Sequence, residues 1–241
     1  MKSMSITAST ESVKSIFENN ELEIPRYQRK YEWKKDDAAE LWNTIIESYD
    51  EETSRPAGPF LGNIILKEGH QKKKIEVIDG QQRLTTLTIL LISLLKYTAK
   101  EKESLRNKDD KDNKKFDEMA SINNQCSRLL YDPTPNRPKM YFHASDDIRD
   151  MFENMVRESW EDFKTKEPKI TITNRSWSKA KEKRRKLVRD LFNYYTDELK
   201  KLTSSNKGIN VERLFSIIEK INFVKITIND DEDAYSLLKG Q

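Results

Sequence analysis

Five consecutive residues combine groups that bind anions with a group that can hold a metal ion or a water molecule: Asp79, Gly80, Gln81, Gln82 and Arg83. They follow a short apolar run and precede a long apolar helical pattern, so they lie at a strand-to-helix junction. The first N–H groups of a helix have no partner within it and lie at the positive end of its dipole, so such a junction binds phosphates. Glycine permits close approach, and the glutamine amides and the guanidinium add donors. The carboxylate repels phosphate, which gives it a purpose if it positions Mg²⁺ or an attacking water.

A simpler interpretation of the same five residues is also open. Asp79 would cap the helix, Arg83 would form an exposed ion pair, and the two glutamines would lie on the surface. Short motifs have many false positives, so the residues alone do not decide between the two interpretations.

A second cluster lies upstream, in the segment IPRYQRKYEW at residues 24–33. Interleaved cations and aromatic rings suit stacking on a base with contacts to phosphate. The alternative is an ordinary connection whose aromatic rings pack inward while its cations reach solvent, and taken alone the segment favours this alternative. The cluster consists of three cations, three aromatic residues and one glutamine: Arg26, Arg29, Lys30, Tyr27, Tyr31, Trp33 and Gln28.

The elements that position these clusters follow from hydrophobic periodicity. Strands are predicted near residues 22–24, 60–66, 74–78 and 223–228, with a hairpin between the second and third. Helices are predicted near residues 13–17, 36–49, 81–99, 145–160, 178–202 and 211–221. The charged residues 100–115 are expected to form an exposed helix or a loop, and YDPTPNRPKM a proline-rich turn. This pattern predicts an α+β fold. It has a small mixed sheet with helices in residues 1–100, a mainly helical subdomain in 101–222, and a strand returning to the core in 223–241.

Composition limits the function classes. Only 6 glycines and 7 prolines argue against an all-β sandwich or barrel. A net charge of +3 over 241 residues is too small to name a partner. The single cysteine, Cys126, excludes an intrachain disulfide framework and fits the cytoplasm. No signal peptide is visible, and the longest apolar run, residues 84–95, is too short for a membrane span.

The motifs IPRYQRKYEW, FLGNIIL and VIDGQQRLTTL, in this order, resemble the N-terminal domain of GmrSD-type modification-dependent restriction endonucleases, most densely over residues 22–95. The resemblance implies a core fold like that of ParB and sulfiredoxin. It also implies binding and hydrolysis of a nucleoside triphosphate, GTP or ATP with Mg²⁺, and sensing of modified or foreign DNA in phage defence. A nucleotide- or DNA-binding sensor without turnover is the alternative. Self-association and the identity of the nucleotide are left open.

The resemblance also assigns roles to residues. Asp79, Gln82 and Arg83 are the expected catalytic residues, and Asp79 is the expected metal ligand. The expected nucleotide-binding residues are Tyr27, Gln28, Arg29, Tyr31, Gly80, Gln81, Gln82 and Arg83.

Relatives of this family continue into a segment like FETLNSRG and then into a His-Asn-His nuclease domain. Here DEDAYSLLKGQ begins such a segment, so we expect a fragment or a short member, with the nuclease in a downstream domain or subunit. A nuclease of this type needs a histidine base among clustered metal ligands, and the chain has only His70 and His143, far apart. No nuclease site is therefore expected within this chain.

Residues 164–189 hold eleven Lys or Arg against two Glu, with Trp177 among them. On a helix, Lys179, Lys183, Lys186 and Arg189 form a basic face suited to a DNA backbone, and Arg184 and Arg185 add to its charge. The alternative is a solvated face that pairs with acidic residues.

Overall fold

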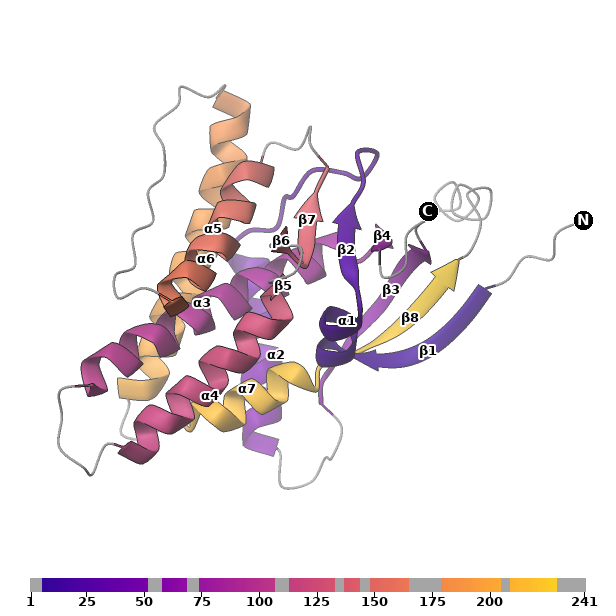
Figure 1. Ribbon diagram of the computed structural model, residues 1–241. Helices are drawn as coiled ribbons and strands as arrows, with labels where there is room; N and C mark the ends of the chain where they lie inside the picture. The colour runs from indigo at the N-terminus through magenta and orange to yellow at the C-terminus, as the bar shows by residue number, and fades with distance from the viewer. Residues whose placement is uncertain are drawn as a thin grey trace, which may run out of the picture.

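The computed structural model describes residues 6–51, 58–68, 74–106, 113–132, 137–143, 148–164, 179–204 and 209–228. Figure 1 shows the strands gathered at one side of the molecule and most helices at the other. The strands are β1 (Ile6–Ser12), β2 (Glu21–Ile24), β3 (Phe60–Glu68), β4 (Lys74–Asp79), β5 (Tyr131–Asp132), β6 (Arg137–Pro138), β7 (Met140–Phe142) and β8 (Asn222–Ile228). The helices are α1 (Val13–Asn19), α2 (Lys35–Glu51), α3 (Gln81–Leu105), α4 (Asn113–Leu130), α5 (Arg149–Lys164), α6 (Lys179–Ser204) and α7 (Val211–Glu219).

Six strands form one mixed sheet in the order β1-β8-β3-β4-β2-β7. The predicted hairpin is the antiparallel pair β3–β4, and β8 returns to pair in parallel with β3. β2 pairs in parallel with both β4 and β7. The parallel arrangement of β2 and β4 brings the segment after β2 and the junction after β4 to the same end of the sheet. All four predicted strands are therefore confirmed, and so is the α+β class; the ParB-like core stays a prediction.

Two sheet strands escaped prediction. β1 lies in the Ser/Thr-rich start, which lacks apolar alternation because most of this edge strand is exposed. β7 has only three residues and begins at Met140, the last residue of the segment YDPTPNRPKM, for which the prolines predict a turn. This segment also contributes β5 and β6, which pair with each other in a separate two-stranded sheet.

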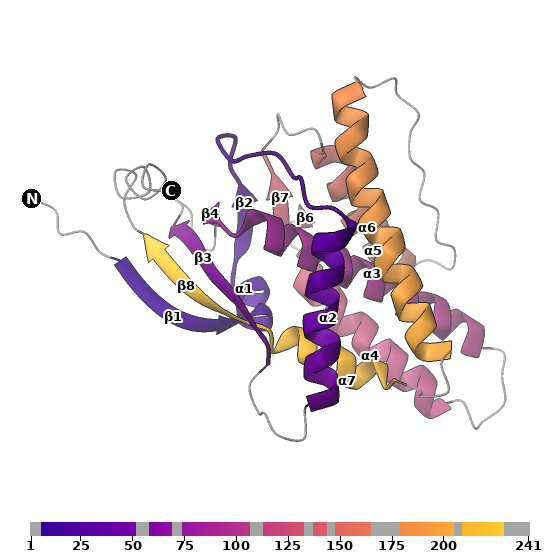
Figure 2. The same ribbon diagram turned by 180° about the vertical axis from the view of Figure 1, so that it is seen from behind.

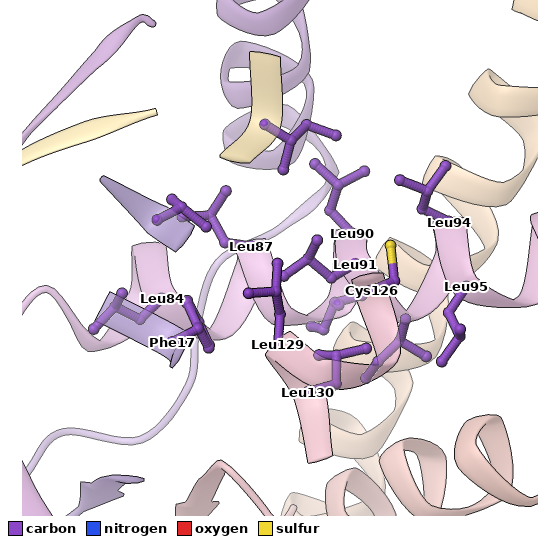
Figure 3. Close-up of a cluster of buried hydrophobic side chains, with 14 of the residues drawn as sticks. Phe17, Leu84, Leu87, Leu90, Leu91, Leu94, Leu95, Cys126, Leu129 and Leu130 are labelled. Atoms are coloured by element: carbon purple, nitrogen blue, oxygen red, sulfur yellow. The ribbon is translucent and has the colours of Figure 1, made fainter. Parts of the chain in front are cut away.

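The helix α3 is the centre of the hydrophobic core. Every residue from Leu84 to Leu95 is buried, so neighbours surround this part of the helix on all sides. Figure 3 shows its leucines meeting Phe17 and the α4 residues Cys126, Leu129 and Leu130. The helix runs to Leu105, past the predicted end, because the lysines and glutamates after Ala99 are good helix formers.

The helices α4 and α6 both pack against α3. α4 was not predicted, although it buries one side, with Ile122 and Cys126 fully inside. A single cluster of buried side chains includes residues from α3, α4, α6 and α7. The predicted boundary between an α/β part and a helical part near residue 100 stays a prediction. A single hydrophobic core contains residues from both sides of this boundary.

The other predicted helices are confirmed. α1 is capped by the Ser12 side chain, and α7 is capped by Asn210. The first residues of the helix predicted near 145–160, residues 145–147, lie outside the described residues. Among the described residues, no helix has the length and apolar composition needed to cross a membrane.

Candidate functional site at the start of helix α3

The strand β4 ends at Asp79, and α3 begins two residues later at Gln81. Gly80 stands between them with φ +89°, in the left-handed region. A Cβ at this position would lie 2.6 Å from Cγ2 of Ile64, so the close packing of the turn on β3 also requires glycine. Because glycine has no side chain to cap the helix, the N–H groups of Gln81, Gln82 and Arg83 have no acceptor among the described residues. This start of a 25-residue helix can therefore receive an anion.

Arg83 lies beside this helix start. Its Nη1 donates to the carbonyl oxygen of Leu61 at 2.7 Å, and its Nη2 is 3.7 Å from Oδ2 of Asp79. The two side chains are 25% and 41% exposed, respectively. The simpler interpretation thus holds for the ion pair but not for the cap, because the Asp79 carboxylate accepts no backbone hydrogen bond from any described residue. Both charged groups remain within reach of a bound molecule.

The two adjacent glutamines are both buried but have different surroundings. The Gln82 Oε1 accepts from the N–H of Glu32 at 3.0 Å and of Trp33 at 3.3 Å, and its Nε2 donates to the carbonyl oxygen of Lys30 at 3.1 Å. Gln82 therefore holds the segment that joins β2 to α2. The side chain of Gln81 is only 3% exposed, yet neither polar atom of its amide has a partner among the described residues. A buried amide without a partner is rare, and a ligand or a water molecule can supply one.

This difference predicts effects of different size for the same substitution at the two neighbouring positions. Gln82→Leu leaves three backbone groups without their partner, so we expect it to lower the free energy of unfolding by about 2–4 kcal/mol. Gln81→Leu removes an unsatisfied amide at similar volume, so we expect a change within about 1 kcal/mol. Urea unfolding of the two variants without nucleotide measures both values. Equal losses would show that Gln82 does not hold the segment.

The segment after β2 divides its aromatic residues between core and surface. Tyr31 is 1% exposed, and its hydroxyl lies 2.7 Å from Oγ1 of Thr86. Burial raises the pKa of this hydroxyl well above its usual range. This burial corrects the expectation that Tyr31 lies against a nucleotide, because its ring belongs to the core. Tyr27 is 56% exposed and donates to Oε2 of Glu76 at 3.2 Å, so it is the tyrosine that a ligand could reach.

The two remaining upstream residues also differ. Gln28 donates through Nε2 to the carbonyl oxygen of Ile78 at 2.7 Å, one residue before Asp79. This bond ties the upstream segment to the end of β4. Arg29 has an exposed side chain on the same segment. The structure therefore joins the two predicted clusters through hydrogen bonds of Gln28 and Gln82.

Asp79 is the predicted metal ligand. The described residues contain no group of three or more His, Cys, Asp or Glu side chains that could hold a metal ion. The partly exposed Asp79 carboxylate can still hold Mg²⁺, since this ion takes one or two carboxylates and completes its shell with phosphate oxygens and water.

The structure also changes the predicted basic face of residues 164–189. Residues 165–178, including Trp177, lie outside the described residues. On α6, Lys179, Lys183 and Lys186 are exposed, whereas Arg185 is buried and is therefore removed from the face. Arg189 forms an ion pair with Glu182.

Two residues near the site were not singled out from the sequence. Leu61 contributes its carbonyl oxygen to Arg83, and Gly62 lies directly beside the guanidinium. A glycine inside a strand pattern such as FLGNIIL indicates a bulge or a close approach, and this signal could have found them.

A mixed sheet whose strand β4 leads through a left-handed glycine into α3 defines an α+β protein in which the first N–H groups of α3 have no acceptor among the described residues. The sequence profile of the GmrSD restriction endonuclease, N-terminal domain, matches residues 13–239. The chain therefore belongs to this family, as its three motifs predicted, and is a component of a restriction system. No curated protein matched the chain in sequence.

Proposed function

We propose that this chain binds and hydrolyses a nucleoside triphosphate with Mg²⁺ and acts as the regulatory or sensor domain of a DNA restriction system. The observation that carries the proposal is the start of α3, where three backbone N–H groups, Arg83 and Asp79 lie together. Membership of the restriction family supports a role that serves a DNA-cleaving partner domain or subunit.

Each group at this site has a proposed task. The N–H groups of residues 81–83 hold a phosphate at the positive end of the α3 dipole. Arg83 and the exposed Arg29 neutralise its charge, and Tyr27 lies against the base or the ribose. Asp79 positions Mg²⁺ or the attacking water.

The two glutamines take different parts in this proposal. Gln81 offers the phosphate or its water shell a buried amide that lacks a partner in the described structure. Gln82 is among the expected catalytic residues, but its amide already bonds the backbone of the segment that carries Arg29. We therefore assign Gln82 a positioning task.

Titration of the purified chain with GTP, ATP and CTP, with and without Mg²⁺, tests the proposal. Calorimetry measures binding, and a phosphate-release assay measures turnover. Binding together with Mg²⁺-dependent release supports a hydrolysing domain. Binding without release supports the alternative, a sensor that does not turn over. Absence of binding by all three nucleotides contradicts the proposal.

A DNA contact on α6 is a second proposed property. Figures 1 and 2 show the first half of α6 extending past the start of α2. Tyr195, in the second half, donates to the carbonyl oxygen of Ala38 at 3.1 Å and so marks where the two helices meet. The exposed Lys179, Lys183 and Lys186 lie in the extending half, where a DNA backbone could reach them.

Reversing these three charges to glutamate is expected to weaken DNA binding. It should also flatten the slope of log K against log salt by about 2–3, since each phosphate contact contributes roughly 0.9. The matched control is Lys200→Glu with Lys201→Glu, which changes exposed lysines at the opposite end of the same helix. Fluorescence anisotropy at several salt concentrations measures both. If the control weakened DNA binding and flattened the slope equally, the binding would depend on net charge and not on the positions of Lys179, Lys183 and Lys186.

A further inference from the structure

The strand β3 contains one residue more than its partner strand requires. Phe60 pairs with Asn222 and Asn63 pairs with Val224, so two residues of β3 lie opposite one residue of β8. This is the geometry of a β-bulge. Gly62 lies in the bulge with φ +86°, a left-handed conformation that other residues rarely adopt.

The bulge reaches the start of α3 through Arg83. The Nη1 of Arg83 donates to the carbonyl oxygen of Leu61, the bulge residue next to Gly62, at 2.7 Å. A Cβ built on Gly62 would lie 2.6 Å from the same Nη1. Any side chain at this position would therefore displace the guanidinium from the Leu61 carbonyl.

We infer that Gly62 is a positioning residue for Arg83: the bulge holds the guanidinium beside the start of α3 before a ligand arrives. The inference rests on the proposed function, in which Arg83 binds a nucleotide phosphate. A free arginine loses rotamer freedom when it binds, whereas one already held by the Leu61 carbonyl loses less. One N–H group of the Arg83 guanidinium donates to the Leu61 carbonyl oxygen in the bulge, and its other N–H groups can donate to a phosphate.

The test uses Gly62→Ala and Gly62→Asn. Both add the Cβ that meets Arg83, but asparagine tolerates positive φ better, so the pair separates the displaced guanidinium from backbone strain. With whichever of GTP or ATP binds the native chain more tightly, we expect both variants to bind at least fivefold more weakly. In an Arg83→Ala background, adding Gly62→Asn should change the affinity less than twofold, because the arginine it acts through is gone. Asn63→Ala, an exposed neighbour on β3, is the control and should bind as the native chain does.

A second measurement reports the position of Arg83 without nucleotide. In ¹⁵N NMR spectra, a guanidinium held by hydrogen bonds gives resolved Nη signals, whereas a freely rotating one gives an averaged signal. We expect resolved signals for Arg83 in the native chain and an averaged signal in Gly62→Asn. This difference in the Arg83 signals would support the positioning role of Gly62 even if the chain bound no nucleotide. Absence of nucleotide binding would overturn the proposed function alone.

Three results would overturn the inference. They are native affinity in Gly62→Asn, an equal further loss of affinity when Gly62→Asn is added to Arg83→Ala, and unchanged Arg83 signals. If neither variant folds, the fold itself requires the bulge, and the positioning role fails as well.

Discussion

Arg83→Ala is expected to weaken nucleotide binding by about 1.5–3 kcal/mol, roughly ten- to a hundredfold in Kd. The guanidinium lies beside the N–H groups that open α3, so its loss removes a charge-assisted contact to phosphate. Isothermal titration with Mg²⁺ and the preferred nucleotide measures the change.

Two further variants make the Arg83 result specific. Arg83→Lys keeps the charge but loses the planar fork, so an intermediate affinity is expected. Arg128→Ala removes an exposed arginine on α4 and should leave the affinity unchanged. Native affinity in Arg83→Ala would contradict the phosphate site at this helix start.

Asp79→Ala is expected to lower phosphate release by at least about a hundredfold while nucleotide binding is retained or improved. The carboxylate repels phosphate and also pairs with Arg83 at 3.7 Å, so its removal frees the guanidinium for the ligand. The group that positions Mg²⁺ or water is lost at the same time. Phosphate release and calorimetry on the same preparation separate the two effects.

The contacts of Asp79 also predict how Asp79→Ala changes the stability of the fold. The Asp79–Arg83 pair is partly exposed, and exposed ion pairs contribute about 0–1 kcal/mol. The Asp79 carboxylate accepts no backbone hydrogen bond from a described residue, so it is not a helix cap. The variant should therefore melt close to the native temperature. A loss of folding in Asp79→Ala would instead make the aspartate structural and remove its catalytic assignment.

Local sequence predicted the part of the site that depends on neighbours in the chain. The change from strand to helical periodicity around Gly80 placed the junction correctly, because both periods are visible within a few residues. The same reasoning found four of the six strands of the main sheet. It missed β1 because an exposed edge strand needs no apolar alternation, and β7 because three residues are too few to show a period.

The basic residues of 164–189 show that local sequence also fails to predict which residues of a helix are buried. The periodicity predicted α6, but Arg185 and Lys186 are adjacent residues of the same charge sign. Packing buries Arg185 and leaves Lys186 exposed. Which cations of this tract reach solvent therefore depends on how α6 packs.

By itself the sequence determined the family, the strand–glycine–helix junction and the residues available for chemistry there. Only the tertiary structure decided which of them are buried and which are exposed. Gln81 and Gln82 are the same residue type at successive positions, and they differ because Gln82 meets a segment about fifty residues away in the chain. Likewise, Tyr31 is buried by its contact with Thr86, whereas Tyr27, four residues earlier, remains exposed. Such contacts depend on how β2, β3 and α3 pack together, and a local pattern of residue types carries no information about that packing.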